Sequence, residues 1–273
     1  MDLAGLLKQI LRPIYRNRCP IEKIIRRRKI SKVSQEDLNA EQLQRFAKIG
    51  LDWDEGRLRV EELLGPNRDP SSHRSEHYEL FAALATRENP SRILEIGTAE
   101  GDFTTFLATI FPQATIETID LSSYNPRFWN ATNKNIVSSS TGASKEDIHA
   151  RDEKLRKFPN ISFIEMNSLA LTYTEKETYD FVWVDGDHTF PVVGIDIANA
   201  LRIVKPAGLV GLDDIYLTPQ RNNQWVGQEL FETLNQFKNS GLINYQLILK
   251  RLFRERNYDL KNQKFIAVAS RTN

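Results

Sequence analysis

The stretch RILEIGTAEGDFTTFLA, residues 92–108, decides the fold of this chain. A short apolar run ends in an acidic residue, two glycines follow four positions apart, and a helical pattern then begins. This order predicts a strand, a tight turn and the start of a helix, an arrangement with which α/β proteins bind nucleotide-like ligands. The glycines allow the backbone to approach a ligand without an intervening Cβ.

Glu95 places a carboxylate beside this turn, where a phosphate-binding loop would avoid one. We therefore expect a ligand with a positive charge at this point, and S-adenosylmethionine fits through its α-amino group and sulfonium. A dinucleotide fingerprint is disfavoured because Ala99 and Asp102 stand where its second and third glycines would lie. A P-loop is disfavoured because no lysine follows Gly101. A structural turn without a ligand stays open on this evidence.

The composition indicates an ordinary globular enzyme. With 273 residues, the chain can hold one large α/β domain and an extension. A net charge of +1 argues against nucleic acid as a partner, and the single cysteine, Cys19, excludes an internal disulfide or a cysteine-based zinc site. There is neither an apolar run long enough to span a membrane nor a secretory signal pattern, so we expect a cytoplasmic protein.

Residues 1–74 differ from the rest and predict a helical extension. Apolar residues at helical spacing in 6–14 predict an amphipathic helix, and a basic cluster follows at 23–32. Ser34 and Asp37 form a capping-box pattern that opens a second helix. The basic cluster could contact a membrane surface or nucleic acid, but a solvated helix face or a subunit contact is the commoner case. A homo-oligomer held by the N-terminal helices is therefore one expectation.

From residue 75 to residue 273, short apolar strands alternate with helices. This pattern predicts a Rossmann-like, doubly wound α/β domain with a seven-stranded, mostly parallel sheet and helices on both faces. An antiparallel hairpin should close one edge. The predicted strands are 92–96, 115–119, 161–165, 181–184, 209–212, 246–252 and 265–269.

Residues 122–158 are longer than a plain crossover requires. The segment contains the polar, turn-prone run SSSTGAS at 138–144. A long insertion at the ligand-binding edge is typical of a lid or a mobile loop. Phe128 and Trp129 are candidates for ligand contacts, although simple packing explains them equally well.

In an open parallel sheet, ligands bind beyond the carboxyl ends of the strands, so the residues there form the candidate site. They are Gly97, Thr98 and Gly101 after the first strand, Asp120 after the second, Asn167 and Ser168 after the third, Asp185, Asp187 and His188 after the fourth, and Asp213 and Asp214 after the fifth. Asp120 stands where an acidic residue accepts hydrogen bonds from ribose, although a surface carboxylate is an equal alternative.

The aspartates after the fourth and fifth strands would repel one another at one rim of the sheet. A hard divalent cation resolves such a conflict by binding carboxylate oxygens. Capping is the structural alternative, and we expect Asp187 to serve it. His188 could accept a proton from a substrate hydroxyl at physiological pH, bind the metal, or pack as a structural histidine. We favour the role of general base.

The order of these features resembles the class I S-adenosylmethionine-dependent methyltransferases over about residues 75–273. Within that class, YDFVWVDGDH at 179–188 and GLVGLDDI at 208–215 are similar to the cation-dependent small-molecule O-methyltransferases, and more closely to the branch called methyltransferase domain 24. Catechol- and caffeoyl-type members usually have Asn at the position of Asp214 and Lys near that of His188.

The resemblance implies a cofactor, S-adenosylmethionine, and roles for single residues. Glu95, Gly97 and Thr98 would border the methionine part, and Gly101 would let the loop pass close to it. Asp120 would bind ribose, and Asn167 and Ser168 would lie near adenine. Asp185, Asp213 and Asp214 fall on the positions of the metal ligands, with Mg²⁺ as the expected ion; Asp185 would also border the cofactor.

These features together predict O-methylation of a small-molecule hydroxyl, assisted by a divalent cation, with His188 as the catalytic base. A catalytically silent cofactor-binding or assembly protein is the first alternative. The second is a methyltransferase acting on nitrogen or on a macromolecule. No Asn-Pro-Pro-Tyr-like motif follows the fourth strand, which disfavours methylation of amino groups on nucleobases or glutamine. The missing glycines disfavour a nicotinamide-dependent oxidoreductase.

Overall fold

The computed structural model describes residues 34–65, 75–122, 145–217, 228–252 and 263–272. A seven-stranded sheet with the order β3-β2-β1-β4-β5-β7-β6 forms its centre. From β1 the chain adds β2 and β3 on one side, and it then crosses to the other side of β1 to add β4 and β5. The sheet is therefore doubly wound. The predicted α/β, Rossmann-like class is confirmed. The strands are β1 (Arg92–Ile96), β2 (Thr115–Asp120), β3 (Ile161–Glu165), β4 (Tyr179–Val184), β5 (Val204–Tyr216), β6 (Ile243–Leu249) and β7 (Lys264–Arg271).

The strand pairing is parallel except at β7. Strands β1 to β5 pair in parallel with their neighbours, whereas β7 runs antiparallel to both β5 and β6. The expected antiparallel hairpin at the sheet edge is thus present. Strand β4 lies in the middle with β1 on one side and β5 on the other, and its Trp183 is completely buried. The continuous apolar runs of β1 and β4 reflect this burial on both faces.

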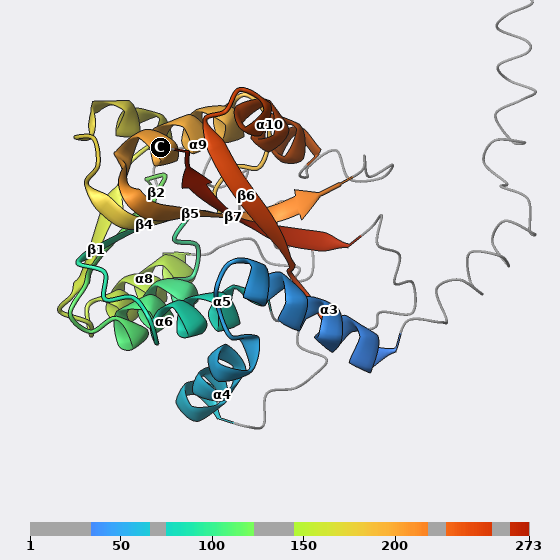
Figure 1. Ribbon diagram of the computed structural model, residues 1–273. Helices are drawn as coiled ribbons and strands as arrows, with labels where there is room; N and C mark the ends of the chain where they lie inside the picture. The colour runs from blue at the N-terminus through green and yellow to red at the C-terminus, as the bar shows by residue number, and fades with distance from the viewer. Residues whose placement is uncertain (1–33, 66–74, 123–144, 218–227, 253–262, 273) are drawn as a thin grey trace, which may run out of the picture.

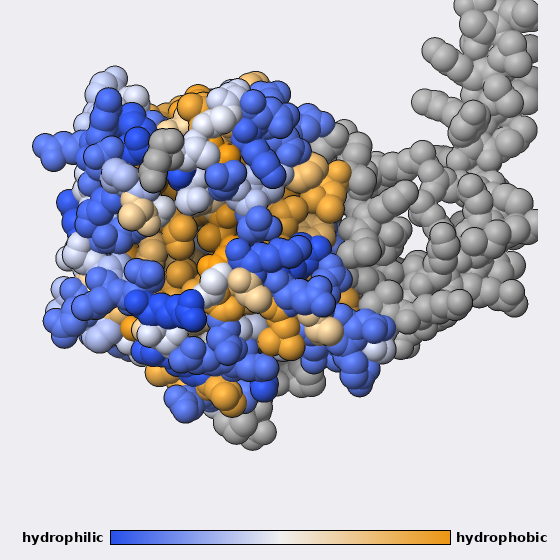
Figure 2. Space-filling model, viewed as in Figure 1, coloured by the Kyte–Doolittle hydropathy of each residue, from blue (hydrophilic) through white to orange (hydrophobic). Residues whose placement is uncertain are grey.

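Helices cover both faces of the sheet (Figure 1). On one face lie α5 (His77–Leu84), α6 (Asp102–Ile110) and α8 (Lys145–Leu155), and on the other α9 (Val192–Ile203) and α10 (Gln228–Asn239). A 3₁₀ helix, Ser168–Tyr173, contacts α9. Figure 2 shows the apolar residues of the visible face gathered in its middle, over the strands, with hydrophilic residues around them.

The helix α3 (Gln35–Lys48) begins at the predicted capping box. The Ser34 hydroxyl accepts a hydrogen bond from the Asp37 backbone, and the Asp37 carboxylate accepts one from the Ser34 backbone. A further helix, α4 (Trp53–Leu64), begins at Asp52, whose side chain caps it. Both helices belong to the predicted extension. The helix predicted in 6–14, the basic cluster and the predicted boundary near residue 74 lie outside the described residues.

Helix α3 protects the outer edge of the sheet. The Gln42 side chain is fully buried; its amide donates to the Leu249 carbonyl at 3.0 Å and accepts from the Leu249 N–H at 2.9 Å. Arg45 donates to the Leu247 carbonyl at 2.7 Å. These contacts satisfy backbone groups of the edge strand β6 that would otherwise be open to pairing with another chain. The described part of the extension therefore completes the fold.

The structure corrects the end of the fifth strand. We predicted 209–212, with Asp213 and Asp214 in the loop beyond it, but β5 continues to Tyr216. Leu212 pairs with Ala267 and Ile215 with Phe265, so β5 carries one extra residue at this point. Asp214 has a φ of +57°, in the left-handed region that Asp and Asn tolerate better than most residues. The two aspartates therefore form a β-bulge, a feature that redirects side chains.

The predicted insertion 122–158 contains one regular element within the described residues. Helix α8 contacts α6, where Lys154 donates to the Glu100 carbonyl at 2.9 Å. This part is the crossover helix that two adjacent parallel strands require. Phe128, Trp129 and the run 138–144 lie outside the described residues. None of the helices that the structure describes combines the length and the apolar character needed to cross a membrane.

We expect Gln42→Leu to destabilise the protein by about 2 to 4 kcal/mol, because it leaves the buried N–H and carbonyl of Leu249 without partners. Urea unfolding followed by circular dichroism measures the change. Gln44→Leu is the matched control, since Gln44 is exposed on the same helix. Equal stability of the two variants would contradict the role given to Gln42.

Candidate functional site

Three turns meet at the carboxyl edge of the sheet, those that follow β1, β2 and β4. Gly97 donates its N–H to the Ile119 carbonyl at 2.9 Å, and Asp185 donates to the Ile96 carbonyl at 2.8 Å. Gly97 has a φ of +101°, and a Cβ there would lie 2.3 Å from the Asp185 carbonyl oxygen. Only glycine fits here, so Gly97 is required for packing between turns.

Glu95 lies buried beneath this junction, with 2 % of its surface exposed. Its carboxylate accepts hydrogen bonds from the hydroxyls of Thr104 and Thr118, the latter at 2.7 Å. Burial raises the pKa of Glu95 to about 8; the two hydroxyls oppose this rise, and the charges of Asp185 and Asp120 add to it. The backbone hydrogen bonds that join the ends of β1, β2 and β4 bring these three sequence-predicted acids to one junction.

Asp120 ends β2 and faces the glycine turn. Its carboxylate accepts from the Ala99 N–H at 3.0 Å and from the Leu121 N–H at 2.7 Å. Burial raises the pKa of Asp120, although these backbone hydrogen bonds lower it. Thr98 is also buried, and its hydroxyl lies 2.7 Å from that of Thr118. The turn after β1 and the end of β2 therefore form one polar unit.

Three other predicted cofactor residues make local contacts. Gly101 precedes α6 with a φ of +75°, and a Cβ there would lie 2.9 Å from Leu155 Cδ2 of α8. Its small size is thus used for helix packing. Asn167 caps the 3₁₀ helix by accepting from the Leu169 N–H at 3.0 Å, and Ser168 is the first residue of that helix. Both follow β3, as predicted.

Asp185 and His188 form a pair after β4. His188 Nε2 lies 3.3 Å from Asp185 Oδ1. Burial raises the pKa of Asp185 to about 6, with the charge of Asp213 adding to the rise and the hydrogen bond from His188 opposing it. Burial would lower the pKa of His188, but the hydrogen bond to Asp185 and the surrounding carboxylates raise it. His188 Nδ1 is buried and has no hydrogen-bond partner within the described ranges.

Asp187 serves a local turn and does not cap helix α9, so the expected capping role is wrong. Its carboxylate accepts from the Thr189 N–H at 2.9 Å and from the Thr189 hydroxyl at 2.6 Å. The turn precedes α9. The N-cap position of this helix is occupied by Pro191, and no side chain caps it. Asp187 therefore has a structural role and is removed from the candidate chemistry.

Two lysines that sequence reasoning missed occupy the acidic rim. Lys250 Nζ contacts Asp213 Oδ2 closely and lies 2.5 Å from Asp214 Oδ1; Lys264 Nζ lies 2.6 Å from Asp214 Oδ2. These ammonium charges outweigh the effect of burial and hold the pKa of Asp214 far below its usual range. The lysines stand at the end of β6 and the start of β7, where no pattern distinguishes them from other lysines.

The predicted cation site does not fit these contacts. Three oxygens of Asp213 and Asp214 already bind ammonium groups, whereas Mg²⁺ requires about six oxygens in octahedral order. No group of three or more histidine, cysteine or acidic side chains suited to a metal occurs among the residues that the structure describes. The Mg²⁺ ligands predicted from sequence are therefore salt-bridge partners in this structure.

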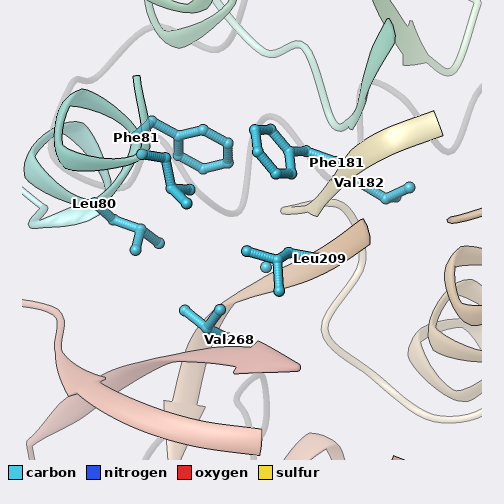
Figure 3. Close-up of a pocket in the computed structure, with 8 residues that line it drawn as sticks. Leu80, Phe81, Phe181, Val182, Leu209 and Val268 are labelled. Atoms are coloured by element: carbon cyan, nitrogen blue, oxygen red, sulfur yellow. The ribbon is translucent and has the colours of Figure 1, made fainter. Parts of the chain in front are cut away.

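A small cavity elsewhere is a packing feature. Figure 3 shows Leu80 and Phe81 of α5 facing Phe181, Leu209 and Val268 of the sheet. The lining is apolar, and the volume of about 10 Å³ admits at most one water molecule. The cavity is therefore too small for a nucleoside. We place the candidate site at the carboxyl edge, where the polar residues converge.

Residues 94–215 match the family model described as a methyltransferase domain, the branch known as methyltransferase domain 24. The strand order and the glycine turn agree with this match. Residues 94–215, which run from β1 to β5, are therefore similar to the methyltransferase 24 branch of the class I S-adenosylmethionine-dependent methyltransferases, and this span is a little less than half of the chain. The match includes all the predicted acidic site residues but neither lysine.

Solved structures agree with the fold. The O-methyltransferase TomG from Streptomyces achromogenes, involved in tomaymycin synthesis and solved with S-adenosylmethionine, aligns with a TM-score of 0.50, 16 % identity and coverage of 88 % of this chain and 100 % of TomG. A Klebsiella pneumoniae protein provisionally assigned as an O-methyltransferase aligns with a TM-score of 0.49, 16 % identity and coverage of 89 % and 93 %. A search of curated proteins found no match.

We expect the stability of the unliganded protein to fall between pH 5 and pH 8, partly because of Glu95. The folded state keeps the Glu95 proton up to a pKa of about 8, whereas the unfolded chain releases it near 4.5, so rising pH favours unfolding across that window. Glu95→Gln should remove a decline on the order of a few kcal/mol, measured by urea unfolding at several pH values. Glu100→Gln, an exposed neighbour, is the control. Parallel curves for wild type and Glu95→Gln would refute the assignment.

Proposed function

We propose that this protein transfers the methyl group of S-adenosylmethionine to a hydroxyl of a small molecule at the carboxyl edge of the sheet. The observation that carries the proposal is the junction of the turns after β1, β2 and β4, which bears Glu95, Asp120 and the Asp185–His188 pair. A site lined by carboxylates selects a ligand with positive charge. The adjacent imidazole provides a group that can accept a proton.

The acidic residues fit the charges and hydroxyls of S-adenosylmethionine. Asp120 would accept hydrogen bonds from the ribose hydroxyls, for which a carboxylate at the end of the second strand is suited. Asp185 would complement the positive charge of the methionine part, and that charge would in turn favour the ionised form of Glu95, with Gly97 and Thr98 in the turn beside it. Asn167 and Ser168 would lie near adenine, as we proposed from sequence.

His188 would act as the general base. When bound, S-adenosylmethionine supplies a methyl group on a positively charged sulfur, and its transfer to a hydroxyl oxygen releases one proton. Asp185 accepts from Nε2, which leaves Nδ1 as the unprotonated nitrogen of neutral His188. This nitrogen has no partner in the described part of the protein and could take the proton from a hydroxyl within hydrogen-bonding reach.

The alternatives give different ligand responses. A silent cofactor-binding protein would bind S-adenosylhomocysteine but transfer no methyl group. A nicotinamide-dependent enzyme would be stabilised by NAD. A ligand at 100 times its Kd stabilises a protein by about 2.7 kcal/mol, so thermal unfolding with each ligand separates these cases. A small-molecule hydroxyl as the methyl acceptor, a homo-oligomeric state and a cytoplasmic location stay predictions. The alternative acceptor, a nitrogen or a macromolecule, stays open as well.

We expect Asp120→Ala to weaken binding of S-adenosylhomocysteine by about 10- to 100-fold, because a carboxylate that accepts from ribose contributes a charge-assisted hydrogen bond. Isothermal titration calorimetry measures the affinity. Asp102→Asn is the matched control, since this nearby carboxylate is exposed and pairs with Lys154. An unchanged affinity of Asp120→Ala would remove Asp120 from the site.

We expect His188→Ala to lower kcat by about 10²- to 10⁴-fold, because general-base catalysis contributes factors of this size. Transfer of radiolabelled methyl to a panel of phenols, sugars and hydroxylated polyketides first identifies an acceptor. The affinity for S-adenosylhomocysteine should stay near that of wild type. His149→Ala is the control, because His149 is exposed on α8 and pairs only with Glu153 among the described residues. Wild-type turnover by His188→Ala would show that another group takes the proton.

A further inference from the structure

We propose that the ammonium groups of Lys250 and Lys264 take the place of a divalent cation in this site, so that methyl transfer needs no bound metal. The catalytic consequence rests on the proposed function. The structural part depends only on the ion pairs around the bulge in β5. The proposal as a whole contradicts the requirement for a divalent cation that we expected from the sequence.

The bulge explains why both aspartates meet lysines. The extra residue in β5 shifts the register against β7 between Leu212 and Ile215, and Asp213 and Asp214 occupy this shift. Their carboxylates contact Lys250 and Lys264, which come from the β6–β7 hairpin. The hairpin thus supplies the positive charge from within the protein.

The two lysines are held in place by backbone contacts. The Lys250 N–H donates to the Lys264 carbonyl at 3.0 Å, and the Lys250 carbonyl accepts from the Glu76 N–H at 2.8 Å. The side chains of Lys250 and Asp213 are only 8 % and 2 % exposed. Such buried charges stay paired, because separation would leave each one desolvated without a partner.

The charges of the cluster are nearly balanced without a metal. Asp185, Asp213 and Asp214 carry three negative charges and the lysines two positive ones, which leaves a single negative charge when His188 is neutral. Protonated His188 would neutralise it. A divalent cation added to this set would leave an excess of positive charge and would have to displace ammonium groups from Asp213 and Asp214.

Lys250 also links the bulge to the proposed base. The positive charge of Lys250 and the negative charge of ionised Asp185 attract each other, and Asp185 in turn holds His188 Nε2. Lys250 is therefore a positioning residue, which acts on proton transfer through Asp185. A metal in this position would attract the same carboxylate, so the ammonium group can serve the same electrostatic role.

The test compares wild type with the double variant Lys250→Met/Lys264→Met in thermal unfolding, with MgCl₂ and with excess EDTA. Wild type should unfold at the same temperature in both, within about 1 °C, because no metal site exists to be filled. In EDTA the variant should unfold about 10 °C lower, since buried carboxylates have lost their partners. MgCl₂ should restore much of this loss, because the freed carboxylates can then bind the ion.

A matched control removes a lysine from an ion pair at the other end of the sheet. Lys205 lies 2.7 Å from Asp180 in a more exposed ion pair, so Lys205→Met should lose less stability and gain no response to MgCl₂. If the double variant does not fold, Lys264→Met alone replaces it, with a smaller response expected. Wild type that purifies with a stoichiometric metal, or that is stabilised by MgCl₂, overturns the proposal. A variant without any Mg²⁺ response overturns it as well.

The catalytic part is measured on the same proteins. Methyl transfer by wild type should be unchanged by EDTA, and Lys250→Arg should keep more activity than Lys250→Met because it preserves the positive charge. The pH profile of kcat should shift in Lys250→Met. Loss of activity in EDTA overturns the proposal. Failure to bind S-adenosylhomocysteine would overturn the proposed function instead, and the unfolding experiment would still decide whether the lysines replace a metal.

Discussion

The structure of the site depends on the close contact between the turns that follow β1 and β4. Gly97 touches the Asp185 carbonyl so closely that no side chain fits, and backbone hydrogen bonds join these turns to each other and to β2. The contact brings Asp120 and Asp185 close to Glu95, and their negative charges add to the rise in the pKa of Glu95 that burial causes. An acidic pocket of this kind costs folding stability, and a cationic ligand relieves that cost.

A second constraint acts at the edge strand β6. Helix α3 binds the outer edge of β6 through Gln42 and Arg45, and Glu76 binds the Lys250 carbonyl. These residues lie outside the span that matches the methyltransferase family. They nevertheless fix the strand that carries Lys250 next to Asp213 and Asp214. Helix α3 therefore helps to position the lysines of the β6–β7 hairpin beside the aspartates of the candidate site.

Much of the fold could be predicted because it follows from local patterns. Strands β1 and β3 have the predicted bounds, since short apolar runs are strong signals. The capping box at Ser34 and Asp37 was equally readable. The end of β5 was not, because an aspartate pair after an apolar run indicates a loop, whereas pairing with β7 extends the strand through a bulge.

The sequence alone determined the class of the protein and the acids at its site, because strand ends in a parallel sheet always meet at one edge. It gave Asp187 a capping role, whereas the structure shows that this carboxylate holds the turn at Thr189. Only the tertiary structure decided what those acids contact. Lys250 stands 37 positions and Lys264 50 positions from the aspartates that they bind. Such ion pairs depend on how β6 and β7 lie against β5, which no local spacing specifies, and they turn an expected metal site into a network of salt bridges.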